Sequence, residues 1–290
     1  MTTALSEFYH DEFMEAAAEL GIELIIIDPE QVNIIFGQPS KIYDNQGNEI
    51  IADGFFVRAM NKSYTQCAYL AQALKSQGCI MLDGIERFNG TAPNKMITSM
   101  RRSVSGVGAK TIKFTNNFIR ANQATIRPML PLFAKPISSS QNRGLVRINT
   151  IEELITYNTD EYVIQENLNI VDEYRVLAHK TSDDITVFGI THKKTIGLRG
   201  SNPGKKFKIS ENTQNRLIEF IRSLPRDVNG DGLFGYDIAK LENGSLVLIE
   251  ANRSPMWERT ERIRKVSVAS EILKLMLNIY NTKNAANRVL

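Results

Sequence analysis

The sequence predicts an α/β protein, because buried-strand patterns alternate with amphipathic helices along most of its 290 residues. Over about the first ninety positions, short apolar runs are separated from helical patterns by turn-forming residues, which is typical of a small α/β domain. In the C-terminal part, Asn243-Gly244 lies between two apolar runs. Such a pair is the strongest short-range signal for a β-hairpin.

Capping and turn residues mark the ends of the predicted helices and strands in the N-terminal part. A helix is expected from Ser6, which can cap it, to Leu20, with Gly21 as its stop. A second helix is expected over Ser63–Gln77, and the turn at 45–48 separates two short strands. The longer predicted strands are Ile22–Asp28, Gly54–Ala59 and Cys79–Asp83. Together these elements predict an N-terminal α/β domain over residues 1–92.

The remaining elements predict a second domain over residues 93–290, divided into parts over about 93–165 and 166–290. Its predicted helices are Lys95–Ser105, Thr150–Tyr157, Ser210–Ser223 and Val266–Tyr280, followed by a polar tail. Its predicted strands are Thr111–Thr115, Leu132–Lys135, Tyr162–Glu166, Arg175–His179 and Ile185–Thr191, before the hairpin. Thr150 and Glu153 have the spacing of a capping box, which fixes the start of one helix.

Composition excludes several classes of protein. The net charge of +3, with both signs interspersed, is too small to indicate a nucleic-acid binder. Cys67 and Cys79 are too few for a disulfide framework, so we expect free thiols and a cytoplasmic location. Apolar runs such as Leu24–Ile27 are too short to cross a membrane, and the acidic N-terminus does not resemble a signal peptide.

The hairpin predicts a pair of facing carboxylates. If Asn243 and Gly244 form a two-residue loop, Leu241 pairs with Leu246, Ala239 with Leu248, and Asp237 with Glu250. Directly opposed carboxylates repel unless a proton or a cation lies between them. The alternative is that both acids point to solvent, but the apolar residues that we place on the same face indicate a covered one.

Asn252 follows Glu250 by two positions and therefore projects from the same face of the strand. Asp, Glu and Asn together offer hard oxygen ligands, which suit Mg²⁺ held partly by protein and partly by phosphates. The sequence therefore predicts a magnesium site formed by Asp237, Glu250 and Asn252.

Two lysines lie where they could bind phosphate. Lys135 ends an apolar strand and precedes a run of small polar residues that reaches Gly144. An ammonium group beside backbone N–H and hydroxyl donors can hold a phosphate, although an ordinary surface turn is the alternative. Lys95 opens a helix, where a cation is unfavourable unless an anion is near; a solvated lysine is the alternative.

In chain order, these lysines, the apolar strand YVIQENL at 162–168, the DEYR segment at 172–175 and GYDIA…LIEANRSP at 235–255 resemble the ATP-grasp superfamily. The resemblance is closest to the branch that includes ribosomal protein S6 glutamate ligase and glutathione synthetase. It covers roughly Asn94 to Pro255, and more weakly the domain before it. It implies an ATP-grasp fold in which two α+β subdomains enclose the nucleotide.

The resemblance also implies a role for each matching residue. Lys95 and Lys135 would contact the ATP phosphates, covered by a loop that includes Ser138, Ser139 and Ser140. The groups around the adenine and the ribose would be Gln165, Glu166, Asn167 and Leu168, with Glu173, or equally Asp172, at the ribose. Asp237, Glu250 and Asn252 would bind Mg²⁺, with Mn²⁺ as a substitute. The groups at the transferred phosphate or the acyl-phosphate oxygen would be Arg175, Arg199 and Asn202. This sequence departs from the family in two places: SSSQNRG stands where relatives carry several glycines, and residues 197–202 match only approximately.

The implied activity is an ADP-forming ligation of a carboxylate to an amine through an acyl phosphate. The partners would be a small-molecule, peptide or protein carboxylate and an amino acid or other amine, and a homo-oligomer is allowed. The alternatives are a phosphotransferase on the same scaffold and a nucleotide-binding module without catalysis. Intact metal ligands and both lysines favour an enzyme.

Two further patterns indicate less. Residues 227–232 resemble the first half of an EF-hand loop, but Ile238 stands where that loop needs a bidentate Glu, so we predict a polar turn. The basic cluster in 193–208 contains little aromatic interleaving. A loop over nucleotide phosphates or a solvated face explains it as well as nucleic acid would.

Overall fold

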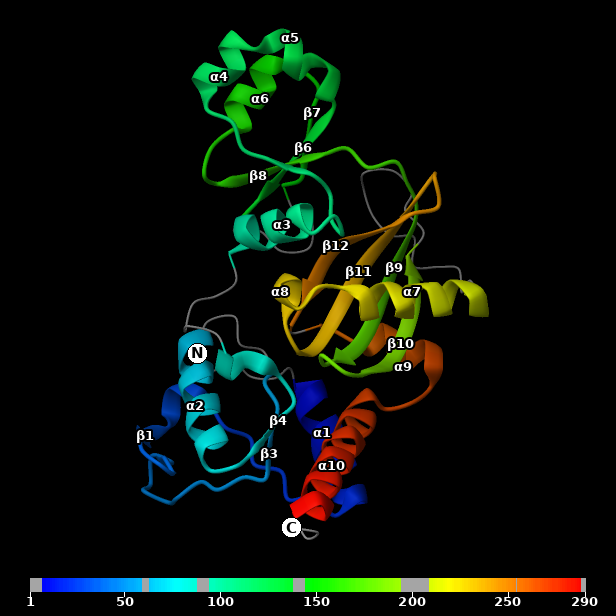
Figure 1. Cartoon of the computed structure of the whole chain (residues 1–290). Helices are drawn as coiled ribbons and strands as arrows, with labels where there is room; N and C mark the ends of the chain where they lie inside the picture. Colours follow the sequence, from blue (N-terminus) through cyan, green and yellow to red (C-terminus); the bar gives the residue numbers. More distant parts are fainter. Residues whose placement is uncertain are drawn as a thin grey trace.

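The computed structural model describes residues 7–58, 63–87, 94–137, 144–193, 209–253 and 255–287. Two four-stranded antiparallel sheets form its frame, and two two-stranded sheets lie in the N-terminal part (Figure 1). The mixed α/β architecture predicted from the sequence is confirmed. The domain boundaries at 92 and 165 stay predictions.

The larger sheet has the strand order β10-β9-β11-β12. These strands are β9 (Ile170–Lys180), β10 (Ile185–Lys193), β11 (Gly232–Leu241) and β12 (Leu246–Asn252). Helices α7 (Glu211–Ser223) and α8 (Arg226–Asn229) cover one face. The core under them contains Phe234 and Tyr236 from β11, packed with Leu217 and Ile221 from α7.

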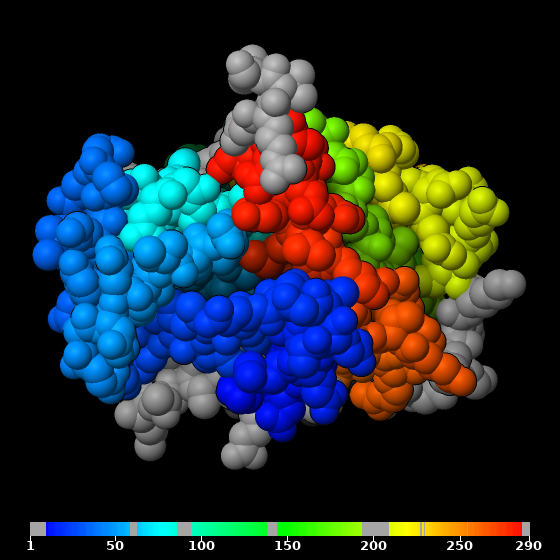
Figure 2. Space-filling view, turned by 90° about the horizontal axis from the view of Figure 1, so that it is seen from below, coloured from blue at the N-terminus to red at the C-terminus, as the bar shows by residue number. Residues whose placement is uncertain are grey.

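On the opposite face of the larger sheet, one end is covered by apolar residues. There, Leu177 and Leu233 pack with Trp257 and with residues of α1 (Glu7–Leu20) and α10 (Val268–Asn287). A further helix, α9 (Glu258–Arg264), contacts β10. Helices α1 and α10 lie side by side although they come from opposite ends of the chain (Figure 2). The other end of this face carries the charged residues of the candidate site.

The smaller sheet has the strand order β5-β8-β6-β7. Its strands are β5 (Thr111–Ile112), β6 (Leu132–Pro136), β7 (Val146–Ile148) and β8 (Tyr162–Glu166). The helices that pack with it are α4 (Asn116–Ala121), α5 (Gln123–Ile126) and α6 (Ile151–Tyr157), and the exposed 3-10 turn Arg127–Met129 follows α5. The expected capping box of Thr150 and Glu153 is present. Helix α3 (Lys95–Val104) lies between the two sheets (Figure 1).

The N-terminal part consists of α2 (Tyr64–Ser76) and short strands and turns. These are the 3-10 turns Pro29–Gln31 and Gly84–Arg87 and the strands β1 (Asn33–Ile35), β2 (Lys41–Tyr43), β3 (Gly54–Phe55) and β4 (Ile80–Met81). Cys67 and Cys79 are buried and not bonded to each other, as expected. Across the part of the chain that the structure describes, none of the helices has the length and apolarity that a membrane span requires.

Several helices confirm their predicted bounds, but three predictions were wrong in part. The expected strand Ile22–Asp28 does not form, and Ile25 and Ile26 are exposed. The strand expected over Gly54–Ala59 has only its first two residues in β3. The tail expected after Tyr280 continues α10 as far as Asn287.

The pairing of β11 with β12 was also predicted incorrectly for the residues between the hairpin loop and the Asp237–Glu250 pair. Leu241 donates its N–H to the carbonyl of Ser245 (2.9 Å), so the loop has three residues and not two. Ala239 therefore pairs with Val247, and Ile238 with Leu248. A β-bulge then restores the predicted pairing of Asp237 with Glu250. Leu248 consequently lies on the α7 side, away from the two acids, so it does not cover them.

Asp83 fixes the N-terminal part to the larger sheet. Its carboxylate accepts the backbone N–H of Val57 (3.1 Å) and of Leu233 at the start of β11 (3.2 Å). Complete burial raises the pKa of Asp83 to about 6, although both N–H groups and the charges of Arg253 and Arg58 lower it. Next to it, the carbonyl of Leu82 is 2.9 Å from His179 Nε2 of β9. One carboxylate thus joins two units of the fold.

A carboxyl pair at the start of α10 predicts a pH-dependent stability. Burial, and then the hydrogen bond with Glu12, raise the pKa of Glu261 from 4.5 to about 8. The protonated form is therefore favoured in the folded state, and stability present below pH 4.5 is lost as the pH rises through 8. We expect Glu261→Gln to remove this loss, about 1–2 kcal/mol after solvent screening. Urea unfolding at pH 5 and pH 9 measures it, with the exposed Glu15→Gln as control. An unchanged pH dependence in Glu261→Gln would contradict the assignment.

Candidate active site

A row of charged residues crosses the larger sheet. Arg175 of β9 is the register partner of Asp237 of β11, which in turn is the partner of Glu250 of β12. Arg175 Nε lies 2.7 Å from Asp237 Oδ1, and its Nη2 lies 2.5 Å from Oδ2. This two-point ion pair offsets the repulsion between the facing carboxylates that the sequence predicted. The prediction of a carboxylate pair is thereby confirmed, together with a cation that holds one member.

Glu250 is approached by cations from three elements. Its charge raises the pKa of Lys135 of β6, of Arg102 of α3 and of Arg175 of β9. Burial lowers the pKa of Lys135 and of Arg102, and for both residues it is the largest effect. The predicted phosphate lysine on the smaller sheet therefore lies within electrostatic range of the predicted metal ligand on the larger sheet.

Glu173 and Asp172, the two candidates for binding the ribose, lie on opposite faces of β9. Glu173 lies on the same face of β9 as Arg175, because residues two apart share a face, and its charge acts on both Lys135 and Arg175. Asp172 projects from the other face, where its Oδ1 is 2.8 Å from His192 Nε2. The sequence left these two equal, whereas the geometry favours Glu173.

The predicted adenine segment runs along the end of β8. Glu166 donates its N–H to the carbonyl of Lys110 (3.0 Å), and its carboxylate accepts the N–H of Lys110 (2.8 Å). Gln165 Nε2 donates to Thr111 Oγ1 (3.3 Å). Asn167 and Leu168 follow, between the two sheets. The segment thus links the smaller sheet to β9.

Lys95 occupies the first turn of α3, as predicted. Asn94 caps this helix, with its side-chain oxygen accepting the N–H groups of Met96 and Ile97. The charge of Lys95 lowers the pKa of Lys135, which places the two lysines within electrostatic range of each other. Five predicted site residues lie outside the described ranges: Ser138, Ser139, Ser140, Arg199 and Asn202.

The donor set on this face fits Mg²⁺. Asp237, Glu250 and Asn252 lie on adjacent strands, with Asn252 paired to Gly235 two positions from Asp237. Each carboxylate oxygen of Asp237 accepts a hydrogen bond from Arg175, which fixes the orientation of this candidate ligand. No group of three or more His, Cys, Asp or Glu side chains suited to a metal occurs among the described residues. Two carboxylates and an amide, completed by phosphate and water, agree with a magnesium site and not with an all-protein cage.

Arg102 is the functional candidate that sequence reasoning missed. An arginine within a helix ordinarily indicates a solvated surface, yet Arg102 is buried, with Nη2 3.1 Å from Ser99 Oγ. Gly108 leaves it room, because a Cβ there would lie 2.6 Å from the Cβ of Arg102. The available signal was its spacing of seven residues from Lys95, which places both cations on one face of α3.

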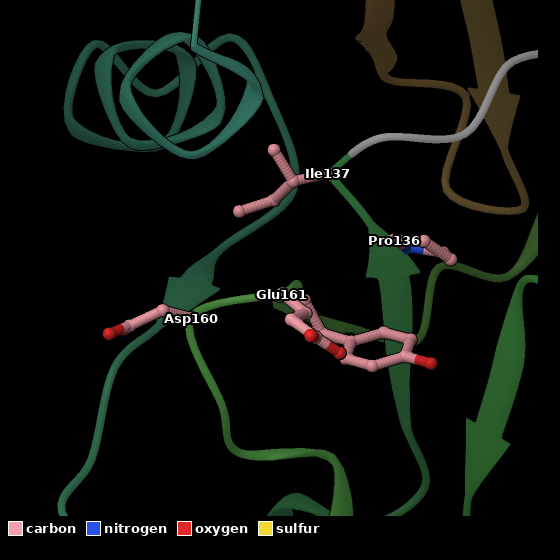
Figure 3. A pocket seen from close by; sticks show the side chains of 5 residues that line it. Pro136, Ile137, Asp160 and Glu161 are labelled. Atoms are coloured by element: carbon pink, nitrogen blue, oxygen red, sulfur yellow. The ribbon is translucent and has the colours of Figure 1, made fainter.

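A cavity of about 380 Å³ lies beside this site, at the end of β6 (Figure 3). It is lined by Pro136, Ile137, Asp160, Glu161 and Tyr162. A second cavity of about 300 Å³ shares Ile137 and Asp160 and extends to Met96 and Met100 of α3. Arg175, Asp237 and Glu250, which form the charged row, line neither cavity. We therefore place the chemistry at the row and not in the cavities.

We expect Glu173→Gln to weaken ATP binding about tenfold, because it replaces the carboxylate that would accept hydrogen bonds from the hydroxyl groups of the ribose. Asp172→Asn is the matched control and should bind ATP as the wild type does, since its side chain lies on the opposite face. Calorimetric titration of each variant with MgATP measures the difference of about 1.4 kcal/mol. The assignment is wrong if Asp172→Asn weakens binding and Glu173→Gln does not.

Arg102→Met keeps the length of the side chain and removes its charge. We expect this change to weaken ATP binding at least tenfold, about 1.4 kcal/mol, because it removes a cation that the proposal places at the phosphates. Arg101→Met alters the exposed neighbour in the same helix and serves as control. Equal ATP affinities for the two variants would show that Arg102 does not face the nucleotide.

No protein-family model matches the chain. The tetrahydromethanopterin:alpha-L-glutamate ligase of Methanococcus maripaludis is 25% identical to it, over 92% of this chain and 94% of that protein. Among solved structures, the ATP-grasp ligase PsnB with a phosphomimetic precursor variant, Mg and ADP matches with a TM-score of 0.64 at 14% identity, covering 96% of this chain and 95% of PsnB.

Two other solved structures are similar to this chain in fold. The macrocyclase MdnB of Microcystis aeruginosa matches with a TM-score of 0.58 at 14% identity, covering 95% of this chain and 96% of MdnB. The VanG D-Ala:D-Ser ligase of Enterococcus faecalis matches with a TM-score of 0.51 at 18% identity, covering 73% of this chain and 68% of VanG. This chain therefore has the ATP-grasp fold, which confirms the resemblance seen in its sequence.

Proposed function

We propose that this protein is an ADP-forming ligase that joins a carboxylate to an amine through an acyl phosphate. The observation that carries the proposal is the row of Arg175, Asp237 and Glu250, with Lys135 and Arg102 in electrostatic range of Glu250. Cations and metal ligands are the groups that phosphoryl transfer requires, because catalysis consists mainly of positioning and charge stabilisation.

In this proposal each group of site residues binds a different part of the substrates or the metal. Lys95, Lys135 and Arg102 bind the phosphates, while residues 165–168 hold the adenine and Glu173 the ribose. The metal ligands are Asp237, Glu250 and Asn252, and bound Mg²⁺ would neutralise charge on the phosphate oxygens. Arg175 holds the Asp237 carboxylate in place through two hydrogen bonds. By resemblance, Ser138, Ser139 and Ser140 cover the phosphates, and Arg199 and Asn202 contact the transferred group.

The reaction needs no nucleophile from the protein. An oxygen of the substrate carboxylate attacks the γ-phosphorus of ATP, and ADP leaves. The amine then attacks the acyl carbon, inorganic phosphate leaves, and the amine loses a proton. The protein contributes by holding the reactants in line and by balancing charge as it develops.

L-glutamate is the first amine to test. The Methanococcus maripaludis relative is named as an alpha-L-glutamate ligase and covers almost the whole chain. A structure of PsnB contains a precursor peptide and AMPPNP, so a peptide is the first source of the carboxylate to test.

The experiment is ADP release with MgATP, a panel of carboxylates, and L-glutamate present or absent. A ligase releases ADP at least tenfold faster with the amine present and yields an amide detectable by mass spectrometry. Glu250→Gln should abolish the reaction, and the exposed Glu242→Gln, in the hairpin loop, should leave it unchanged. A stable phosphorylated carboxylate formed without the amine would instead indicate a phosphotransferase, and absence of turnover across the panel would indicate a nucleotide-binding module.

A further inference from the structure

Helix α3 carries an exposed stripe of apolar side chains. Ile97, Met100 and Val104 are spaced by three and four residues, so they lie on one face of the helix. These side chains are 50%, 47% and 88% exposed, respectively. Isolated apolar residues are common on protein surfaces, whereas a contiguous exposed stripe indicates a contact surface. The opposite face of α3 already has its contacts, because Ser99 and Arg102 are buried there.

The stripe continues into the two cavities at the end of β6. Met100 belongs to the stripe and also lines the smaller cavity, together with Met96 and Ile137. The larger cavity shares Ile137 and Asp160 with it (Figure 3), and Asp160 is paired with Lys113 (2.7 Å). Methionine side chains adapt readily to the shape of a partner. We call the apolar part of this region the α3 surface, which consists of Met96, Ile97, Met100, Val104 and Ile137.

Charged side chains of opposite sign flank the α3 surface. A rotation of about 100° per residue places Met100 and Arg101 on opposite sides of Ile97 around the helix. Met100 borders the cavities, so Arg101 borders the other side of the stripe. Beyond the cavities, Glu161 lines the larger one and is exposed. Within the described part of the chain, neither Arg101 nor Glu161 uses its side chain in an ion pair or hydrogen bond.

We propose that the α3 surface binds a second copy of this chain. A two-fold axis brings the same surface of both copies together, so such a surface must complement itself. With the axis parallel to α3, the two apolar stripes meet, and Arg101 of each copy faces the side on which the other copy carries Glu161. A basic side and an acidic side flanking one apolar stripe meet this requirement, whereas a partner of a single charge would oppose one of them.

The test is sedimentation equilibrium of the wild type without nucleotide, from about 1 μM to about 100 μM protein. We expect a monomer–dimer equilibrium in this range. Val104→Glu places a charge in the apolar stripe and should weaken dimerisation at least about tenfold. Because Val104 is exposed in the single chain, this variant should keep the Tm of the wild type. Arg120→Glu, at an exposed position of α4, is the matched control and should dimerise as the wild type does.

Two charge variants show whether the contact is between copies. Arg101→Glu and Glu161→Arg should each weaken dimerisation about tenfold, because each brings like charges together twice in one dimer. A mixture of the two variants should form heterodimers with the affinity of the wild type, since both charge pairs then have opposite signs. A contact within a single chain could not be restored by mixing.

The proposal is overturned if the wild type stays monomeric over the whole concentration range, because the α3 surface would then lack a second copy as its occupant. Dimerisation of Val104→Glu with the affinity of the wild type would also overturn it, since the interface would lie elsewhere. The same holds if mixing the two charge variants restores nothing. Association is measured without nucleotide, so these outcomes are independent of the proposed ligase activity.

Discussion

Two carboxylates that face each other across neighbouring strands are the constraint on which the arrangement of this protein depends. Asp237 and Glu250 would repel if no cation were near, and the fold supplies cations from several elements. Arg175 comes from the next strand of the same sheet, whereas Lys135 and Arg102 come from the smaller sheet and from α3. The smaller sheet and α3 must therefore lie over this end of the larger sheet. Charged residues from the two sheets and from α3 thus meet at one place.

The same strand, β11, connects the site to the N-terminal part. Its first residues bind Asp83, its middle carries Asp237, and its apolar residues on one face pack under α7. Leu233 on the other face packs with Trp257 and α1, so the apolar end of that face lies next to Asp83 and away from Asp237.

Sequence reasoning predicted the acid pair because local turn chemistry and strand alternation are strong signals, but one step of that reasoning was wrong. A three-residue loop shifts the register by one position, and a bulge before Glu250 shifts it back. Neither feature has a clear sequence signal, so the pairing near the loop could not be predicted. The strand expected over Ile22–Asp28 failed because an apolar run does not by itself supply a pairing partner, and Ile25 and Ile26 are exposed. Arg102 was missed because the polar side chain of an arginine gives no sequence signal of burial, and Arg102 is buried only in the folded structure.

The most direct test of the account is thermal unfolding with and without MgATP, on the wild type and on Glu250→Gln. A ligand that binds only the folded state raises its stability, by about 2.7 kcal/mol at a hundredfold excess over Kd. The account predicts a magnesium-dependent rise in Tm for the wild type that Glu250→Gln lacks, with equal Tm values for the two proteins when no ligand is present. An equal MgATP-dependent rise in both proteins, or none in the wild type, would contradict the central claim that this row of charges binds the nucleotide.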